Sequence, residues 1–524
     1  MNRNVIGAGL IVLLMAVCAG LYGGYSWWHA RSLQTAASDS KVNSHIRIGG
    51  DGYLGYFFMR SPQMKTQAAR RGIGVEFTDD GGDYNARLEK FNRGDYDAIV
   101  LPINSYLTHG QKFNYPGVIV AAIAESKGAD AMACFTGPGN KLPADFKVQD
   151  LDDASLKIVY TGESPSSFLM DLTIADFDLY NLQKTDVWRS EVGGSSEALA
   201  KARKHEGDCF VMWEPDVSRA LKEIPGLKKV WGSDKFGGYI VDVFVFSRSF
   251  VDRHNDDVSG FLQSYFQAMR YYSHDHDALV KDMSSVHNLG ANDLEAMLKA
   301  KEIHWYDLQE NATNEFGLNS NGGASSGVVN TINAATDVLL STKKLSQDPL
   351  GGDPFKIINS TILQTVQAQL PKDIGNNGSG PRQFSALADE DWQPANGKVN
   401  EIGLLRVEPI TFQAGVATLS SDGEAQVDKI AELLANNYPD DRVVIRGHTD
   451  KGDDEAFNVQ LSQERANAVM QRLIQVHGID PNRLKAEGMG SSQRPKHRDG
   501  ESFREYMYRI PRVEFTLYED VSNF

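Results

Sequence analysis

Short apolar runs alternate with stretches of helical periodicity between residues 45 and 250. Two sets of three runs have the length of single strands, at 45–50, 72–77, 97–102, 156–162, 186–192 and 208–213. Stretches between them have apolar residues at helical spacing, as at 84–94 and 166–179. Because strands that alternate with helices form right-handed βαβ units, the pattern predicts an α/β fold with two lobes and largely parallel sheets.

Two further apolar segments connect these sets. Residues 118–135 alternate like a strand that crosses from the first lobe to the second, and residues 238–247 return after the second set. Two lobes joined by crossing strands place a cleft at the carboxyl ends of their strands. A ligand site is therefore expected in that cleft.

After residue 250 the pattern changes to helices and then to a smaller α/β unit. Helical periodicity covers 256–272 and 292–303, and a last helix is expected at 353–370. A polar run rich in Gly, Pro and Asn at 371–398 predicts a linker. The small unit is expected to contain a strand at 404–412, a helix at 422–438 with a Ser421–Glu424 capping box, a strand at 442–447, a long helix around 458–478 and a strand at 511–519. The predicted domains are thus 1–30, 45–370, a linker at 371–400, and 401–520.

The first 30 residues form a segment of their own, because residues 5–28 carry no charged side chain and end in Tyr25, Trp27 and Trp28. Such a run can span a membrane as a helix with an interfacial aromatic belt. The competing interpretation is a signal peptide cleaved near residues 17–19. The apolar run continues past that site, which favours an uncleaved inner-membrane anchor. In either case the residues from 29 onward are expected in the periplasm, free or associated with the outer membrane if the signal is cleaved.

Composition narrows the class of protein. Hydrophobic residues make up 41% of the 524 residues, enough for a packed core, and the net charge of −16 argues against a nucleic-acid partner. The cysteines and histidines match no metal-binding spacing, so no metal and no cofactor is expected. Cys134 and Cys209 lie in apolar strand-like runs, where a buried free thiol is the simpler interpretation. An oxidising compartment leaves a disulfide open.

Four strings in the first large unit carry a family resemblance. They are YDAIVLP followed by NSY, TGESPSSFLMD, EVGGSSEALAKA and GDCFVMWEPDVSRA. With them, residues 45–370 resemble the periplasmic substrate-binding proteins of ABC importers, in the branch for nitrate, sulfonates and thiamine precursors. The resemblance implies a two-lobed type II binding protein that closes around a small solute.

Candidate solute-binding residues lie where the predicted strands end: Gly50, Asp51, Tyr53, Asn104, Ser105, Ser164, Ser166, Ser167, Trp213 and Glu214. Glycines let backbone amides approach a ligand, and serine hydroxyls at the start of a helix form a candidate anion site. The alternative is that the serines only cap a helix and that Trp213 only packs.

Several carboxylates complicate a simple oxyanion site. Asp51, Glu163, Glu214 and Asp216 all fall near the predicted cleft, and unpaired carboxylates in a dry cleft repel an anion. A zwitterionic or cationic organic solute therefore competes with phosphate or a sulfonate.

The most specific motif follows the strand at 442–447. G-H-T-D and N-x-x-L-S-x-x-R-A are formed by Gly447, His448, Thr449, Asp450, Asn458, Leu461, Ser462, Arg465 and Ala466. The string closely resembles the peptidoglycan-binding signature of OmpA-like domains, which also occur in Pal lipoproteins and flagellar stator proteins. The closing N-R-R-V-E run of the family is only partly kept, as the residues 510–514 read IPRVE.

Asp450 and Arg465 are the central pair of this motif. One interpretation is a structural ion pair between them. In the other, which the resemblance implies, Asp450 binds the ammonium and Arg465 a carboxylate of diaminopimelate in the wall peptide. A two-pronged guanidinium suits a carboxylate better than lysine does.

Together these features predict a non-catalytic protein of the Gram-negative cell envelope. It would bind a small solute and hold to peptidoglycan, as a transport accessory or sensor with a possible permease partner. A stator-like or scaffold subunit of an envelope complex is the alternative, although residues 5–28 contain no acidic residue for proton transfer. An enzyme is not expected, because G-x-S-x-G, P-loop and zinc motifs are absent from the sequence.

Overall fold

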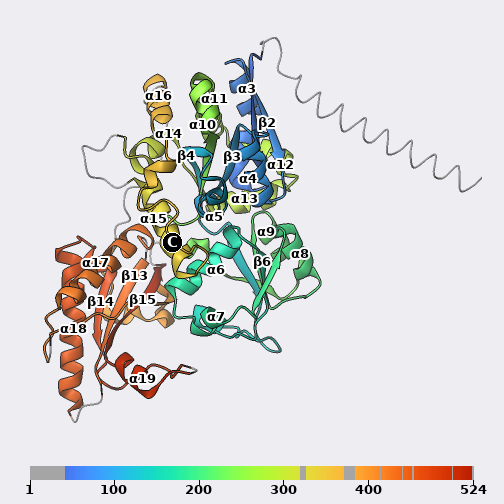
Figure 1. Cartoon of the computed structure of the whole chain (residues 1–524). Coiled ribbons are helices and arrows are strands. Elements are labelled where there is room, and N and C mark those ends of the chain that lie inside the picture. The colour runs from blue at the N-terminus through green and yellow to red at the C-terminus, as the bar shows by residue number, and fades with distance from the viewer. Residues whose placement is uncertain are drawn as a thin grey trace, which may run out of the picture.

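The computed structural model describes residues 42–318, 326–370, 384–413, 415–439, 441–450, 454–498 and 500–521. The predicted anchor or signal segment at 1–30 lies outside these ranges. Among the helices of the described ranges, none has the length and apolar character that crossing a membrane requires. Figure 1 shows three α/β bodies, two of them stacked as lobes and the third beside the second lobe.

Lobe 1 is built on a six-stranded mixed sheet. Its strand order is β11 (Ile303–Trp305), β4 (Gly117–Ser126), β10 (Val241–Ser247), β3 (Ala98–Pro102), β1 (Ser44–Gly50) and β2 (Ile73–Asp79). β1 pairs in parallel with β2 and β3, whereas β10 pairs antiparallel with β3 and β4. Helices of this lobe include η1 (Leu54–Tyr56), α2 (Phe57–Arg60), α3 (Pro62–Ala69), α4 (Tyr84–Arg93) and α5 (Ile103–Gly110).

Lobe 2 has a five-stranded sheet of the same design. The order is β7 (Arg189–Val192), β6 (Ile158–Thr161), β8 (Cys209–Trp213), β5 (Asp130–Phe135) and β9 (Leu227–Gly232). β6 is parallel to β7 and β8, and β5 is antiparallel to β8 and β9. The helices are α6 (Pro165–Asp176), α7 (Tyr180–Lys184), α8 (Ser195–Arg203) and α9 (Asp216–Glu223).

The chain crosses between the lobes twice in strand form. β4 of lobe 1 leads directly into β5 of lobe 2, and β9 leads back into β10. The predicted two-lobed α/β arrangement is therefore present, with strands at all six predicted apolar runs. The crossing strands β4, β5 and β10 are almost entirely buried. The apolar runs that predicted them therefore lie in the interior, where the two lobes join.

Helices after residue 247 cover lobe 1. They are α10 (Arg248–Arg253), α11 (Asn255–His274), α12 (His276–His287), α13 (Ala291–Ala300), α14 (Leu308–Glu310), α15 (Gly327–Ser341) and α16 (Thr361–Gln369). α11 packs on α3 and α16, while α15 contacts both α5 and α6. The single helix predicted at 353–370 is wrong at its start: η6 (Pro354–Ile357) ends in a bridge of Ile358 to Ile119, and Asn359 then accepts a hydrogen bond from the backbone of Thr361.

The third body is a four-stranded sheet with helices on it. Its strands are β12 (Val399–Leu405), β15 (Arg512–Asp520), β13 (Asp441–His448) and β14 (Leu484–Gly488). The helices are α17 (Ser421–Asn436), α18 (Glu455–Gln475) and α19 (Phe503–Arg509), and α18 packs on β13 and β14. Val427, Ile430 and Leu434 of α17 are buried.

Two local predictions in this body need correction. The strand predicted at 404–412 instead covers Val399–Leu405, because β12 pairs with β15 in that register. The cap of α17 is Ser420 and not Ser421: the Ser420 hydroxyl accepts a hydrogen bond from the backbone N–H of Gly423 at 3.0 Å. The predicted capping box of Ser421 with Glu424 is thus not formed.

The second half of the predicted linker is folded against this sheet. Trp392 of η7 (Asp389–Trp392) is 6% exposed and clusters with Val399, Val444 and Tyr518. The buried guanidinium of Arg442 stands 5.6 Å from its ring centroid. Residues 384–398 therefore belong to the third body, and only 371–383 lies between the last described helix of lobe 1 and this body.

The third body also contacts lobe 2 through a polar and aromatic interface. Tyr438 donates a hydrogen bond to Asp176 at the end of α6, at 2.5 Å. Asn437 and Gly237 exchange two hydrogen bonds, and Arg498 forms an ion pair with Asp178 at 2.5 Å. Since Gly237 lies between β9 and β10, the contact reaches the second crossing itself.

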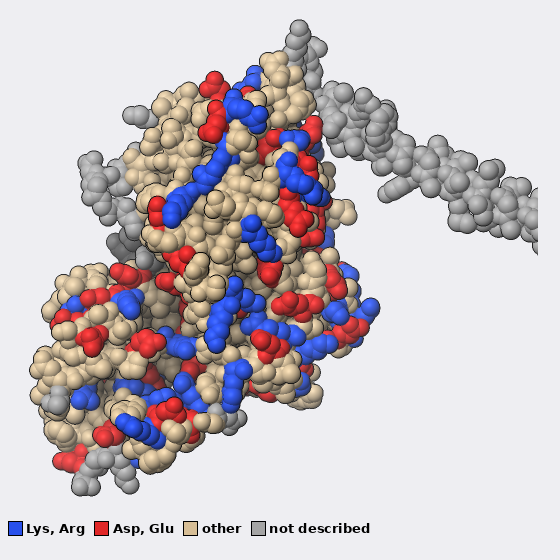
Figure 2. Space-filling view, in the orientation of Figure 1, with Lys and Arg blue, Asp and Glu red and all other residues tan. Residues whose placement is uncertain are grey.

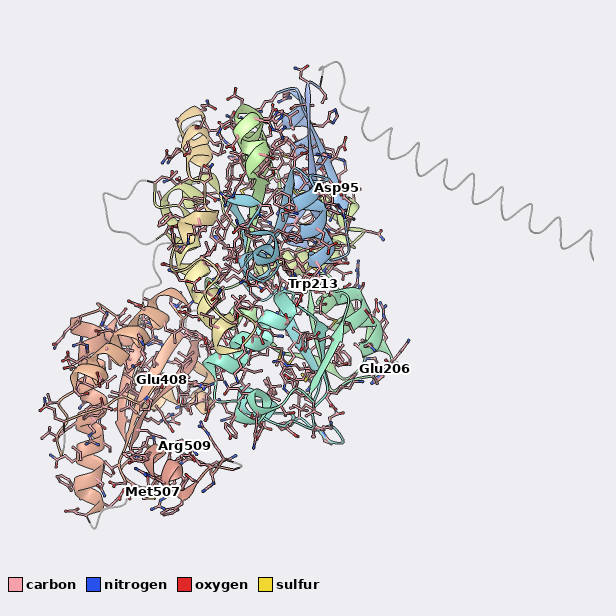
Figure 3. The ribbon with its side chains drawn as sticks, viewed as in Figure 1. Asp95, Glu206, Trp213, Glu408, Met507 and Arg509 are labelled. Atoms are coloured by element: carbon pink, nitrogen blue, oxygen red, sulfur yellow. A yellow bond between two sulfur atoms is a disulfide. The ribbon has the colours of Figure 1, made fainter. Side chains whose placement is uncertain are left out.

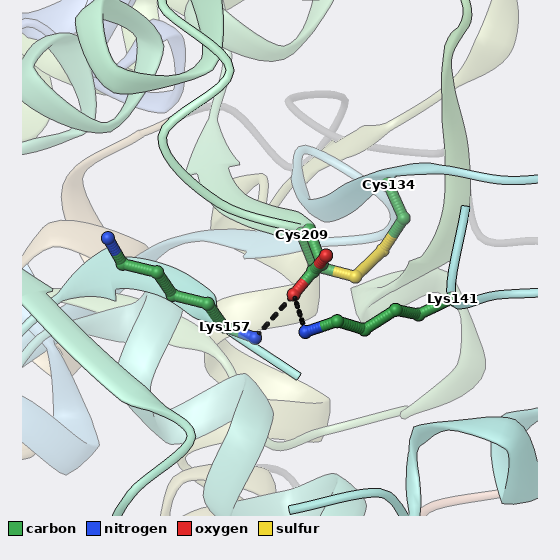
Figure 4. The surroundings of a disulfide bond; sticks show 5 residues. Cys134, Lys141, Lys157 and Cys209 are labelled. Carbon is green, nitrogen blue, oxygen red and sulfur yellow. Dashed lines mark hydrogen bonds and ion pairs between the residues drawn. A yellow bond between two sulfur atoms is a disulfide. The ribbon is translucent and has the colours of Figure 1, made fainter. Parts of the chain in front are cut away.

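Cys134 and Cys209 form a disulfide between β5 and β8, with an S–S distance of 2.05 Å (Figure 4). This corrects the expectation of buried free thiols: the two residues are direct cross-strand neighbours in the lobe 2 sheet, a relationship that spacing along the sequence does not reveal. Beside the disulfide, Asp208 accepts hydrogen bonds from Lys141 Nζ and the backbone N–H of Lys157.

Candidate functional site

At the predicted cleft, residues of lobe 1 and lobe 2 contact each other directly. His109 of α5 lies with Nε2 3.1 Å from the carbonyl oxygen of Glu163, and Asn85 of α4 donates to the Glu163 carboxylate at 3.2 Å. Glu163 has a left-handed φ of 50° in the loop before α6. Trp213, at the boundary of the lobes in Figure 3, packs on the Gly82 turn of lobe 1. The lobes are therefore closed on each other here.

Asp51, at the end of β1, is bound to a buried guanidinium. Arg87 Nη2 lies 2.9 Å from Asp51 and also pairs with Asp80 at 2.5 Å. The same guanidinium donates from Nη1 to the carbonyl oxygen of Val100. Asp51 is thus a paired carboxylate, contrary to the expectation of unpaired acids in the cleft.

The other predicted carboxylates have partners too. Glu163 contacts Asn85 and His109, and Glu214 accepts hydrogen bonds from the hydroxyl and backbone N–H of Ser218. Asp216 forms an ion pair with Arg219 at 3.0 Å. Burial nevertheless raises the pKa of Glu214 to about 7. Glu214 also borders an apolar cavity of about 20 Å³, which is room for about one water.

The structure separates the three candidate serines into two roles. Ser164 caps α6: its hydroxyl accepts from the backbone N–H of Ser166 and donates to the carbonyl of Thr161. Ser167 exchanges hydrogen bonds with the backbone of Ser164. The hydroxyl of Ser166 is buried and has no hydrogen-bond partner among the described residues. Only Ser166 therefore has a side chain left for a ligand.

The candidates at the strand ends of lobe 1 are also buried. Oδ1 of Asn104 and the hydroxyls of Ser105 and Tyr53 lack hydrogen-bond partners within the described part of the chain. Gly50 is different, since a Cβ on it would lie 2.6 Å from both Phe77 and Val100. Close packing, and not an approach to a ligand, accounts for glycine at that position.

Sequence reasoning missed two buried acids at the junction. Asp130 begins β5 and Asp242 is the second residue of β10, so each follows one of the two crossings. The hydroxyl of Tyr56 donates a hydrogen bond to Asp242. Both residues interrupt otherwise apolar runs, GADAMACF and YIVDVFVF, and a charge inside a buried strand is the signal that could have marked them.

The second candidate site lies on the third body, at the end of β13 and the start of α18. Thr449 donates its backbone N–H to Gly490 at 2.9 Å, which fixes the loop that carries Asp450. The carboxylate of Asp450 is exposed, whereas Thr449 is buried with its hydroxyl unpartnered in the described chain. Asp450 is therefore accessible to a ligand, and the hydrogen bond between Thr449 and Gly490 fixes the position of its loop.

Arg465 is half-buried on α18 against the loop after β12. Its guanidinium stands 5.0 Å from the ring centroid of Phe412, and Nε donates weakly to the carbonyl of Val416 at 3.4 Å. Burial lowers the pKa of Arg465, and the charge of Asp450 opposes that effect. Within the described residues the two form no direct ion pair, so the structural pair considered above is not made in this state.

The remaining motif residues surround this pair. Asn458 is buried and its Nδ2 has no partner among the described residues. The hydroxyl of Ser462 donates to the carbonyl of Val459 and accepts from the N–H of Gly490, and Leu461 is half-buried. Ser462 thus holds the loop in place.

Glu514 links the motif to the last strand. It accepts from His448 at 3.2 Å and from Arg512 at 2.6 Å. Burial acts to raise the pKa of Glu514, but the His448 hydrogen bond and the Arg512 charge outweigh it and lower the pKa to about 2. Arg512 and Glu514, which the sequence retains from the closing motif, therefore stabilise the G-H-T-D loop through His448.

Comparison with known proteins identifies the third body. Residues 411–506 match the sequence model of the OmpA family. Outer membrane protein A of Klebsiella pneumoniae is 37% identical over 84 residues, and outer membrane porin F of Pseudomonas aeruginosa is 30% identical over 100 residues. These matches cover 16% and 19% of this chain, and 24% and 28% of those proteins, so the chain spans about a quarter of the length of the relatives it matches. The chain carries an OmpA-family domain at its C-terminal end.

Solved structures resemble the two lobes. The alkanesulfonate-binding protein SsuA of Xanthomonas axonopodis, bound to MOPS, has 14% identity and a TM-score of 0.44, covering 60% of this chain and 96% of its own. The periplasmic nitrate-binding protein NrtA of Synechocystis has 11% identity and a TM-score of 0.48, covering 63% and 91%. The desulfurization enzyme DSZB has 10% identity and a TM-score of 0.41, covering 62% and 99%.

Proposed function

We propose that this protein is a non-catalytic component of the cell envelope that binds a small solute between its two lobes and holds to peptidoglycan through its OmpA-family domain. The observation that carries the proposal is the set of buried, unpartnered polar atoms where the lobes meet. Ser166 of lobe 2 and Asn104 and Ser105 of lobe 1 contribute to it. Because buried polar groups are almost always hydrogen-bonded, these atoms are best explained as ligand contacts.

The peptidoglycan site is proposed at Asp450 and Arg465, with Thr449, Asn458, Leu461 and Ser462 around them. An exposed carboxylate and a half-buried guanidinium that do not pair with each other suit a ligand with both charges. The diaminopimelate of a wall peptide is such a zwitterion, and Arg465 can bind its carboxylate with two parallel hydrogen bonds. The buried amide of Asn458 adds a neutral contact.

The same proposal places the described domains in the periplasm. An oxidising compartment suits the Cys134–Cys209 disulfide. We propose residues 1–30 as the membrane anchor, 45–370 as the solute-binding unit and the third body, from residue 384 onward, as the wall-binding unit, acting as a transport accessory or sensor with a membrane permease as partner. The face shown in Figure 2 has interspersed acidic and basic side chains and no continuous basic surface of the kind nucleic acid requires.

Two measurements on the purified chain test the proposal. Mass spectrometry of the molecules released on denaturation should find one small solute at near-equal molar ratio, and the chain should sediment with isolated sacculi. Turnover of that solute by the protein would contradict a non-catalytic role. Failure to sediment with sacculi would contradict the anchoring role and leave the solute site standing.

A further inference from the structure

Three carboxylates meet where the lobes join. Asp51 follows β1, Asp130 follows the first crossing and Asp242 follows the second, and each is no more than 3% exposed. Two tyrosines connect them: Tyr53 donates its backbone N–H to Asp51, and its ring packs edge-on against Tyr56, which donates its hydroxyl to Asp242. Asp51 and Asp242 are thus linked through a buried aromatic pair, and Asp130 lies near enough for its charge to act on Asp242.

The cation at this junction, Arg87, already has carboxylate partners. The Arg87 guanidinium binds Asp51 and Asp80 and donates to a backbone carbonyl, so it serves two carboxylates. Among the described residues, neither Asp130 nor Asp242 forms an ion pair, and Oδ1 of Asp130 has no hydrogen-bond partner. The junction thus contains more buried acids than cations.

Apart from Nε2 of His287, which lies beside the backbone of Gly52, the unpartnered atoms near the junction among the described residues are oxygens. They belong to Tyr53, Asn104, Ser105, Asp130, Thr161 and Ser166. Carboxylate and amide oxygens only accept hydrogen bonds, and hydroxyls accept as readily as they donate. A ligand that brings hydrogen-bond donors satisfies this whole set, and beside two acids without an ion-pair partner those donors are best carried by a cationic nitrogen.

We propose that the solute is a small organic cation whose charged nitrogen lies between Asp130 and Asp242 and against the rings of Tyr53 and Tyr56. This inference rests on the solute-binding function proposed above and names its ligand class. Aromatic faces and carboxylates together are the surroundings that ammonium groups favour. An anion in the same place would face the uncompensated acids.

The protonation of the two acids agrees with this site. Burial raises the pKa of Asp130 to about 7, with the charge of Asp51 adding to it, and burial raises the pKa of Asp242 well above its usual range. Without a cation these groups hold protons near neutral pH. A bound cation favours their charged forms and stands in for those protons.

The experiment uses the full chain and an acid-soluble extract of bacterial small molecules. The extract is separated at pH 7 into molecules retained by a cation exchanger, molecules retained by an anion exchanger, and the flow-through, which contains neutral and zwitterionic molecules. Each fraction, freed of eluting salt, is added to the protein, and the shift in unfolding temperature is measured. We expect only the cation-exchanger fraction to raise the unfolding temperature, by several degrees.

Amide variants locate the effect. Asp130→Asn and Asp242→Asn keep the side-chain size and remove the charge, so each should fold at least as stably as the parent yet lose most of the ligand-induced shift. Asp171→Asn is the matched control, because Asp171 is another buried acid but lies on α6 beside Arg189. It should keep the shift of the parent.

Each outcome tests either the assignment of a cationic ligand or solute binding itself. A shift from the anion or flow-through fraction alone overturns the cation assignment and leaves solute binding intact. A shift from the cation fraction that survives both Asn variants overturns the site. If no fraction shifts the protein, solute binding itself fails, and this inference fails with it.

Discussion

His109 and Glu163 join the two lobes: Nε2 of His109 lies 3.1 Å from the Glu163 carbonyl oxygen. The histidine is buried on α5 of lobe 1, and the glutamate is held with positive φ in the loop that opens α6 of lobe 2. A hydrogen bond between elements of two lobes forms only when they close. It therefore stabilises the closed state relative to the open one.

His109→Ala should shift the lobes toward the open state. One neutral hydrogen bond contributes about 1 kcal/mol, so the ratio of closed to open molecules should fall about five-fold, and the apparent solute affinity should fall by up to that factor. Hydrogen exchange of the amides in the loop before α6 measures the opening. His254→Ala, an exposed histidine beside Asp257 in lobe 1, is the control and should exchange like the parent. Equal protection in both variants would show that His109 does not hold the lobes together.

The serines before α6 should separate stability from binding. Ser164→Ala removes the helix cap and should lower the free energy of unfolding by about 1 kcal/mol. Ser166→Ala removes a hydroxyl without an internal partner, so stability should change by less than about 0.5 kcal/mol while solute affinity falls. Urea denaturation and calorimetry measure the two effects. A Ser166→Ala protein that binds like the parent would place the ligand elsewhere.

Apolar patterning predicted most strands because their burial is nearly complete. β3 and β8 are uninterrupted apolar runs, and the structure buries every residue of both strands. β9 was not predicted, since Lys228 and Lys229 break its pattern, and it becomes a strand by pairing with β5. Likewise, the late start of α16 depends on Ile358 meeting Ile119, a contact that no local pattern encodes.

The candidate solute site was predictable only in part. Strand ends and the G-E-S-P-S-S string located Asn104 and Ser166, but which serine caps α6 depends on where the helix begins. The partners of Asp51 could not be predicted, because Arg87 lies on a helix 36 positions away. Asp130 and Asp242 lie on strands of two different sheets and come near each other only in the folded chain, where both crossings meet the junction of the lobes.

Asp176 should make the contact between lobe 2 and the OmpA-family domain depend on pH. Burial raises the pKa of Asp176 to about 6, and the Tyr438 hydrogen bond opposes the rise. The unfolded chain loses this proton near pH 4, before the folded protein does. Stability should therefore fall as pH rises from about 4 to 6, by about 1.4 kcal/mol for each pH unit between the two pKa values.

Asp176→Asn should remove this part of the pH dependence. Other buried acids with raised pKa values also make the free energy of unfolding fall as pH rises. The test therefore compares the difference in unfolding free energy between parent and variant at pH 4.5 with the same difference at pH 6.5. Asp145→Asn, an exposed aspartate of lobe 2, should leave the difference near zero. If Asp176→Asn and Asp145→Asn behave alike, the interface does not hold a protonated Asp176.

Arg465→Lys is the sharpest test of wall binding, because it keeps the charge and removes the planar pair of donors. Since Asp450 does not neutralise Arg465 directly, the guanidinium is available for a carboxylate of the wall peptide. We expect Arg465→Lys and Asp450→Asn each to lower binding to isolated sacculi at least ten-fold, as measured by co-sedimentation. Arg472→Lys is the matched control on the same helix, where the guanidinium binds Asp428 of α17 instead, and it should sediment like the parent. If both site variants keep parental binding while circular dichroism shows an intact fold, the chain must hold to the wall through other residues.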